Sequence, residues 1–118
     1  MSISSEKKKE LLQKYKERKP EIGIVAVINK NQQKYLLQTT SNLQGKINSI
    51  RFQLNSGGHP NKALQRDWNT EGAEQFEIIV LEQIEYKEAE AELDHKDDLV
   101  LLKQMWQDKL IAENKLLY

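Results

Sequence analysis

The sequence predicts a single α+β domain in which a small, mainly antiparallel sheet of three strands is flanked by helices. Two observations lead to this fold class. Short apolar runs rich in β-branched residues are bounded by polar turns, as expected of strands. Longer segments carry apolar residues at intervals of three and four, as expected of one face of a helix. A chain of 118 residues suffices for one such domain and is too short for two.

Three segments are predicted to be strands. The run IGIVAVI (22–28) is almost wholly apolar and rich in β-branched residues, which indicates a buried strand. The polar residues NKNQQ (29–33) form a turn, and KYLLQTT (34–40) returns as the second strand of an antiparallel hairpin. FEIIVLEQI (76–84) is the third strand.

An additional helix is predicted at the N-terminus, over residues 4–18. Ser5 can cap this helix. Its narrow apolar stripe consists of Leu11, Leu12 and Tyr15. Pro20 ends it, because the residue before a proline avoids the α region. We therefore divide the chain into an N-terminal helical extension (1–20) and a domain (21–118).

Three further helices complete the predicted order α-β-β-α-α-β-α. Ser41 or Asn42 caps the first of them, and NSGGHP (55–60) ends it. Its apolar positions are Leu43, Ile47, Ile50 and Leu54. The next helix spans roughly 60–69, and a glutamate-rich stretch (85–98) precedes the last one. The apolar stripe of the last helix consists of Leu99, Leu102, Trp106 and Leu110.

The composition is that of a soluble globular protein. It is 38% hydrophobic and 31% charged, which does not fit a disordered chain. The absence of cysteine excludes disulfides, thiolate metal sites and thiol nucleophiles, and agrees with a reducing compartment. The N-terminal sequence MSISSEKKKE has no apolar core, so it predicts neither a signal peptide nor a membrane span. We therefore expect a cytoplasmic protein with no membrane partner.

The charges are divided between the two halves of the chain. Residues 1–68 hold thirteen Lys and Arg against five acids, whereas residues 69–118 hold five against thirteen. The first part therefore carries +8 and the second −8, within a chain of zero net charge. A basic half can bind phosphate groups, or it can simply pair with the acidic half of the same molecule. Both interpretations stay open.

Several short motifs occur in a fixed order along these elements. The first two, Gly23-Ile24 and Asn42-Leu43, begin a strand and a helix. The others are Asn29, Lys34, HPNKALQRDWN (59–69), Gly72, FEIIVLE (76–82), Tyr86, and Trp106 with Leu110. Over residues 21–111 the chain thereby resembles the GIY-YIG nuclease superfamily, and the segment around 59–69 is similar to that of small bacterial members.

The resemblance implies an endonuclease-like fold and a particular chemistry. Members of this superfamily cleave nucleic-acid phosphodiesters. Two strand tyrosines position or activate water, an arginine on the first helix of the domain grips the phosphate, and a glutamate on the last helix holds a divalent metal. Phenol, guanidinium and carboxylate groups suit these three roles.

The register of the motif decides which residues occupy these positions. Counting from Gly23-Ile24 and from Asn42-Leu43 gives the same alignment. It places Tyr35 next to the second tyrosine position rather than in it, so that Tyr35 faces the other side of the sheet. The family positions are then occupied by Val25 and Leu36 for the tyrosines, Gln38 for a glycine, Lys46 for the arginine, Ile50 for a histidine and Lys103 for the glutamate.

These substitutions predict a catalytic centre without its water-activating group, its metal ligand and its phosphate clamp. No metal site and no cofactor are expected, and Mg²⁺ is expected only if the site has been rearranged. His59 is the residual candidate for catalysis, because the family often has a histidine there. The alternative is a loop histidine that forms local hydrogen bonds beside Gly57 and Gly58. His95, in an acidic loop, is expected at the surface.

Four basic residues of the two central helices are candidates for binding nucleic acid. They are Lys46, Arg51, Lys62 and Arg66. Lys62 and Arg66 are one helical turn apart and share a face, so they can follow a phosphate backbone. The alternative is a solvated face that pairs with the acidic half of the chain.

Three functions follow as hypotheses. The first is a catalytically inactive nuclease domain retained as a DNA-binding module. The second is an active metal-dependent endonuclease whose site is rearranged around His59 and a carboxylate from elsewhere. The third is a protein-interaction domain, including a homodimer in which basic and acidic halves pair head to tail.

Overall fold

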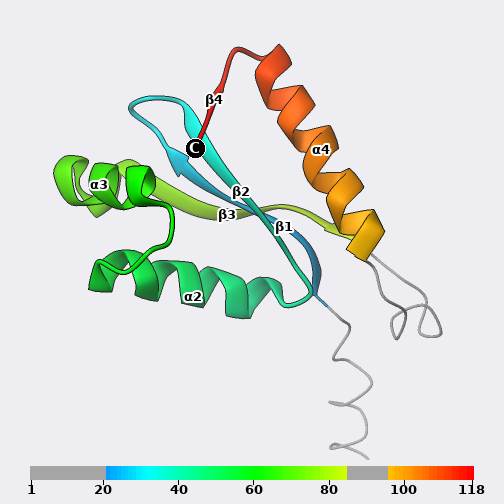
Figure 1. The fold of residues 1–118 in the computed structure, drawn as a ribbon, viewed down its shortest axis with the longest axis horizontal. Helices are drawn as coiled ribbons and strands as arrows, with labels where there is room; N and C mark the ends of the chain where they lie inside the picture. The colour runs from blue at the N-terminus through cyan, green and yellow to red at the C-terminus, as the bar shows by residue number, and fades with distance from the viewer. Residues whose placement is uncertain (1–20, 85–95) are drawn as a thin grey trace, which may run out of the picture.

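The computed structural model describes residues 21–84 and 96–118 (Figure 1). The predicted N-terminal helix, the division at residue 20, Tyr86 and His95 therefore lie outside the described residues. No helix among the described residues is both long enough and apolar enough to cross a membrane.

The described elements follow the predicted order from the first strand onward. The strands are β1 (Ile22–Asn29), β2 (Lys34–Thr40), β3 (Phe76–Ile84) and β4 (Leu116–Leu117). The helices are α2 (Leu43–Ser56), α3 (Lys62–Glu71) and α4 (Lys96–Ala112), with a 3₁₀ turn η1 (Ala73–Gln75). The α+β class and the three predicted strands are confirmed. The last helix begins at Lys96, inside the segment that was predicted to precede it.

The sheet has four strands among the described residues rather than the predicted three. Its order is β3-β1-β2-β4, with β1 antiparallel to β2 and β3, and β4 parallel to β2. The sheet is therefore mixed. Strand β4 was missed because two residues are too few for any periodicity to show. Long-range backbone bonds hold it, from Leu116 N to Gln33 O at 3.0 Å and from Tyr118 N to Tyr35 O at 2.8 Å.

Three layers are stacked, with the sheet in the middle (Figure 1). All eight residues of β1 are buried, because this strand is covered on both faces. One core cluster joins its odd-numbered residues to α2 and α3, and consists of Val25, Val27, Leu36, Leu43, Ile50, Leu54, Leu64 and Phe76. The other cluster joins the even-numbered residues to α4, and consists of Ile24, Ala26, Ile28, Leu37, Leu102 and Leu110.

Side-chain and glycine caps set the ends of the two central helices. Asn42, rather than Ser41, caps α2, with its Oδ1 accepting from Gly45 N at 3.0 Å. Gly57 ends α2 in the left-handed conformation at φ 82°, and Gly58 N donates to Gln53 O at 2.8 Å. Asn61 caps α3 by accepting from Leu64 N at 3.0 Å. The chain therefore reverses between α2 and α3 within five residues.

Candidate nucleic-acid interface

The two residues that the sequence resemblance assigned to tyrosine positions, Val25 and Leu36, lie in the core. Val25 is fully buried, and Leu36 is 8% exposed in the same cluster, against α2. Ile50 is buried there as well. Lys103 is on α4, which packs on the opposite face of the sheet through Leu102 and Leu110. Lys103 therefore lies on the other side of the sheet from Val25 and Leu36, so the residues that the resemblance assigns to one catalytic centre do not lie together.

Tyr35 lies where the register predicts it. It packs against the cluster that faces α4, whereas the adjacent Leu36 packs against the cluster that faces α2. Adjacent strand residues point to opposite faces, so Tyr35 does not approach the α2 side of the sheet.

Gln65 joins α3 to α2 and to the loop between them. Its Nε2 donates to Leu54 O at 2.9 Å and to Asn69 Oδ1 at 3.0 Å. Its Oε1 accepts from His59 N at 3.1 Å. The side chain is 7% exposed, and it gives His59 N an acceptor and adds a second, shorter donor to Leu54 O, which also accepts from Gly57 N at 3.4 Å. Sequence reasoning did not single out this residue.

His59 is held in the loop between α2 and α3 and is 6% exposed. Its Nδ1 accepts from Asn61 N at 3.0 Å, so a neutral ring carries its proton on Nε2. Burial lowers the pKa of His59 below the usual 6.5, and the positive charge of Lys46 acts in the same direction. The ring is therefore neutral at pH 7. The expected local hydrogen bonds beside the glycines are present.

A hollow of about 430 Å³ lies beside this histidine. Its lining includes Gly57, Gly58, His59, Lys62, Gln65 and Arg66. Lys62 and Arg66 are exposed. The structure therefore brings two of the four predicted basic residues together with His59, and Lys46 is close enough to influence its pKa. We call this surface the His59 hollow.

Arg51 lies apart from the other three basic residues. It lines a second hollow of about 250 Å³ whose walls include Asn55, Trp68, Phe76 and Ile78. The rings of Trp68 and Phe76 pack there in a tilted arrangement, with an interplanar angle of 45° and centroids 5.2 Å apart. Five residues separate Arg51 from Lys46, which turns their side chains about 140° apart around α2. The four predicted residues therefore do not form one continuous row.

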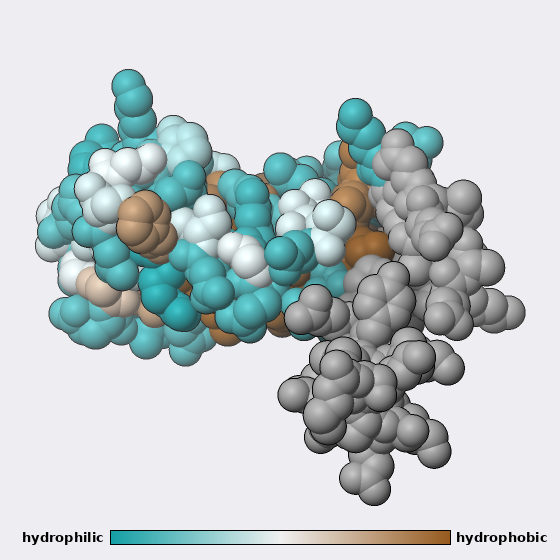
Figure 2. All heavy atoms as spheres, turned by 90° about the horizontal axis from the view of Figure 1, so that it is seen from below, coloured by the Kyte–Doolittle hydropathy of each residue, from teal (hydrophilic) through white to brown (hydrophobic). Residues whose placement is uncertain are grey.

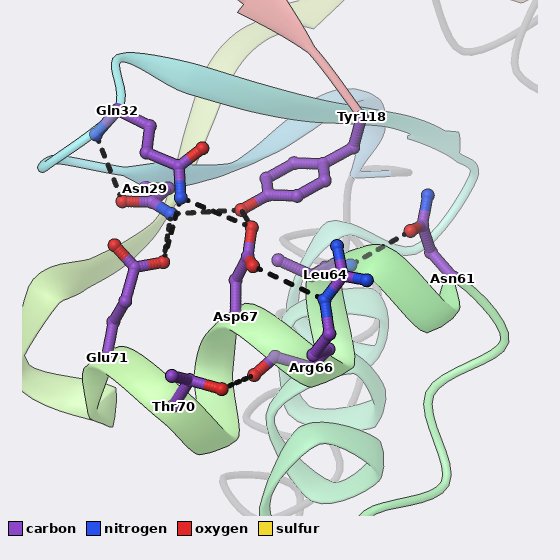
Figure 3. Close-up of polar contacts among 9 residues, drawn as sticks. All are labelled: Asn29, Gln32, Asn61, Leu64, Arg66, Asp67, Thr70, Glu71 and Tyr118. Atoms are coloured by element: carbon purple, nitrogen blue, oxygen red, sulfur yellow. Dashed lines mark hydrogen bonds and ion pairs between the residues drawn. The ribbon is translucent and has the colours of Figure 1, made fainter.

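A polar network on another side of α3 was not foreseen (Figure 3). Asn29 is fully buried, and its Nδ2 donates to Glu71 Oε2 at 2.8 Å and to Tyr118 Oη at 3.0 Å. Tyr118 donates to Asp67 Oδ2 at 2.7 Å. Burial raises the pKa of Tyr118, and its bond to Asp67 acts in the same direction, against the effect of Asn29. The phenol therefore stays protonated and donates.

This network gives α3 two differently charged sides. Asp67 and Glu71 are one helical turn apart and point toward the β1–β2 turn, where Gln32 Nε2 donates to Glu71 Oε2 at 3.0 Å (Figure 3). Arg66 Nε is 3.9 Å from Asp67 Oδ1, but the Arg66 side chain is 76% exposed, so this ion pair is weak. The spacing of Asp67 and Glu71, four residues apart, was the sequence feature that could have predicted two carboxylates on one side of this helix.

The three-layer arrangement around the β1–β2 hairpin is the α+β fold of the GIY-YIG catalytic domain. Two similar solved structures are of the catalytic domain of the homing endonuclease I-TevI. The first has a TM-score of 0.64 and 23% identity, and the match covers 81% of this chain and 95% of that one. The second, a glutamate-to-alanine mutant of the intron endonuclease, has a TM-score of 0.62 and 23% identity over 81% and 90% of the two chains. No protein-family model and no curated protein matches the chain.

Proposed function

We propose that this domain binds the phosphate backbone of nucleic acid at the His59 hollow and does not cleave it. The observation that carries the proposal is the convergence of Lys62, Arg66 and His59 on one surface hollow. The similar solved structures are catalytic domains of an endonuclease, which acts on nucleic acid. The surface on the α2 side of the molecule is mainly hydrophilic, with small separate apolar patches (Figure 2).

The chemistry of the hollow suits a phosphodiester. Two exposed cations can approach phosphate oxygens, and the guanidinium of Arg66 can donate two parallel hydrogen bonds. His59 is neutral at pH 7 and lines the hollow as a possible donor through Nε2. Contacts of this kind carry no sequence information, so the binding is weak, sensitive to salt and tolerant of sequence.

The side chains at the catalytic positions of the family motif do not fit a magnesium ion. Val25 and Leu36 are buried aliphatic chains that offer no ligand atom. Mg²⁺ prefers oxygen ligands, and these two side chains supply none. Among the described residues, no group of three or more His, Cys, Asp or Glu side chains is placed to hold a metal. We therefore assign the domain a binding role rather than a catalytic one.

Binding to a fluorescently labelled DNA duplex, measured by anisotropy between 50 and 200 mM salt, tests the proposal. We expect affinity to fall steeply with salt. The double variant Lys62→Ala/Arg66→Ala should bind more weakly and reduce the slope of log K against log salt by about 1.8, at ~0.9 for each phosphate contact.

The matched control removes two positive charges from α4, on the other side of the sheet. The variant Lys96→Ala/Lys109→Ala has the same net charge as Lys62→Ala/Arg66→Ala. It should change the affinity for DNA much less, because the charges that it removes lie on α4, away from the His59 hollow. If both variants lost the same affinity for DNA, the loss would depend only on net charge, and this result would contradict a site at the His59 hollow. A flat salt dependence of the unmodified protein would remove the proposal altogether.

A second assay tests the absence of cleavage. Supercoiled plasmid incubated with the protein and Mg²⁺ or Mn²⁺ should stay intact. Nicking that His59→Ala abolishes would establish the rearranged-nuclease alternative. Nicking that survives His59→Ala would point to a contaminating enzyme, and it would contradict the proposal only after such an enzyme had been excluded.

A further inference from the structure

The second surface hollow, which we call the Trp68 hollow, lies where α2 and α3 meet the beginning of β3. Its volume is about 250 Å³, and its lining consists of Arg51, Asn55, Trp68, Ala73, Phe76 and Ile78. Arg51 and Asn55 are one helical turn apart on the same side of α2, and both are exposed. Trp68, Phe76 and Ile78 belong to the core cluster or pack against it. The hollow therefore combines apolar surface with exposed polar groups of α2.

Three polar groups of this hollow have no partner within the part of the chain that the structure describes. The side chains of Arg51 and Asn55 form no hydrogen bond or ion pair there, and the indole N–H of Trp68 has no acceptor. The indole N–H of Trp106, by contrast, donates to Glu82 Oε1 at 3.2 Å. An indole that is partly buried usually has an acceptor for its N–H. The polar groups of the Trp68 hollow are therefore available to an outside molecule.

The two aromatic rings of the hollow leave ring surface uncovered. Their planes are tilted by 45°, with centroids 5.2 Å apart, so neither ring lies flat over the other. A planar molecule can pack against the half-buried Trp68, while the amide of Asn55 and the guanidinium of Arg51 bond to its edge. Nucleobases offer both features, because they have a flat π-face and an edge of donors and acceptors.

The Trp68 hollow is next to the His59 hollow. Asn55 of the first lies two residues before the glycine pair that lines the second. Around α3, at about 100° per residue, Gln65 and Asn69 lie between the side chains of Arg66 and Trp68. Gln65 and Asn69 are hydrogen-bonded to each other at 3.0 Å, so one row of side chains separates the two hollows. One strand can therefore place a phosphate in the first hollow and a base in the second.

We propose that the Trp68 hollow holds an unpaired base of the strand whose phosphates bind at the His59 hollow, so that the domain prefers single-stranded nucleic acid. The inference rests on the proposed function, because the phosphate contacts hold the strand against α3. A base within a duplex is stacked and paired, so it must leave the helix before it can enter a protein hollow. Stacking on an aromatic ring tolerates every base, so the preference is for single strands and not for a sequence.

Two single-stranded oligomers with the same number of phosphates test the inference. One is a fluorescein-labelled oligothymidylate, and the other has the same backbone and label but no bases. Both should bind with an affinity that falls with salt. The oligothymidylate should bind at least ~5-fold more tightly, because stacking adds to the phosphate contacts. The variant Arg51→Lys/Asn55→Ala keeps the charge but removes the guanidinium and the amide, so it should lower this ratio of affinities severalfold.

Asn48→Ala is the matched control. Asn48 is exposed on the same side of α2 as Asn55, about two turns earlier, and does not line the hollow. This substitution should leave the ratio of affinities unchanged.

The fluorescence of Trp68 gives a direct readout. The chain has two tryptophans, so Trp106→Phe leaves Trp68 as the only indole. In this variant the oligothymidylate should quench the indole fluorescence, because a base stacks on the ring, whereas the base-free oligomer should not.

The outcomes separate this inference from the proposed function. Equal affinity for the two oligomers would leave phosphate binding intact and overturn the base site. A preference for the oligothymidylate that Arg51→Lys/Asn55→Ala does not change, without quenching of Trp68, would place the base elsewhere and overturn it as well. Binding of neither oligomer would remove the proposed function, and this inference with it.

Discussion

The backbone of β3 passes close to Gly23 of β1. A Cβ atom at this position would collide with the carbonyl oxygen of Glu82, next to the bulge in the pairing of these two strands. We expect Gly23→Ala to lower the free energy of unfolding by about 1–3 kcal/mol, because backbone atoms must move to make room. Urea denaturation measures this difference.

Gly58 provides the control for this prediction. Its Cβ would meet only Ser56 Oγ, at 3.9 Å, which is ordinary contact. Gly58→Ala should therefore change the free energy of unfolding by less than ~0.5 kcal/mol. If the two alanine variants were equally stable, close approach of β3 would not explain the glycine in the first strand.

The buried ring of His59 makes stability depend on pH. Its pKa in the folded protein is lowered from 6.5, so below pH 6.5 the unfolded chain binds a proton that the folded one does not. The free energy of unfolding should therefore fall as pH decreases from 6.5, until pH passes below the lowered pKa. His59→Asn keeps an acceptor for Asn61 N–H and removes the titration, so it should flatten this part of the curve.

The comparison is between stability curves measured from pH 7 to pH 5 by chemical denaturation. Carboxyl groups titrate in every variant, so the difference between the curves isolates the histidine. His95→Asn, in a loop predicted to be exposed, should keep the slope of the unmodified protein. A His59→Asn curve parallel to that of the unmodified protein would contradict a lowered pKa.

One buried amide adds polar contacts to the apolar packing between α2 and α3. Gln65 and Gln44 both donate to an asparagine four residues later, but only Gln65 also bonds to Leu54 O and His59 N. Gln65→Met should cost about 1–3 kcal/mol, because the buried His59 N–H loses its acceptor and Leu54 O keeps only the longer bond from Gly57 N. Gln44→Met should cost less than ~0.5 kcal/mol, since that pair is exposed. Thermal and urea denaturation measure the stability of both variants. Equal stability losses would show that the bonds of Gln65 to Leu54 and His59 contribute no more than the bond to an asparagine within the helix.

At the scale of the whole molecule, Tyr118 links the elements on the two sides of the sheet. The strand β4 follows α4, on one side of the sheet, and Tyr118 then packs against the core cluster on the other side. Its hydroxyl joins Asp67 of α3 to Asn29 of β1. Lys34 Nζ lies 4.5 Å from the centre of its ring. The C-terminal residues thereby connect all three layers.

Removal of this hydroxyl should loosen the molecule as a unit. We expect Tyr118→Phe to lower the free energy of unfolding by about 1–3 kcal/mol, because Asp67 and the buried Asn29 each lose a partner. Amide hydrogen exchange should rise in α3 and in β4 together, since the phenol bonds to Asp67 of α3 and belongs to the residue that directly follows β4. Tyr35→Phe, half-buried on the α4 side, is the control and should change stability by less than ~0.5 kcal/mol. Exchange that rose only in β4 would show that α3 does not depend on the contact.

The sequence by itself determined the α+β class, the hairpin, the third strand and the helices of the domain. These features are local: apolar periodicity, an asparagine before each central helix and a pair of glycines after the first are visible within a few residues. It also placed Lys62 and Arg66 together, because they are one helical turn apart and share a face of the same helix.

Only the tertiary structure decided the rest. The bond between Asn29 and Tyr118 spans 89 positions, and β4 exists through its pairing with β2, so neither leaves a local pattern. The proximity of Lys46 to His59 depends on the loop folding back along α2, and the burial of Val25 and Leu36 depends on what covers the sheet. The surroundings of a side chain are set by elements that are distant in the chain. The sequence could therefore identify candidate residues of the site, but it could not show which of them lie next to one another.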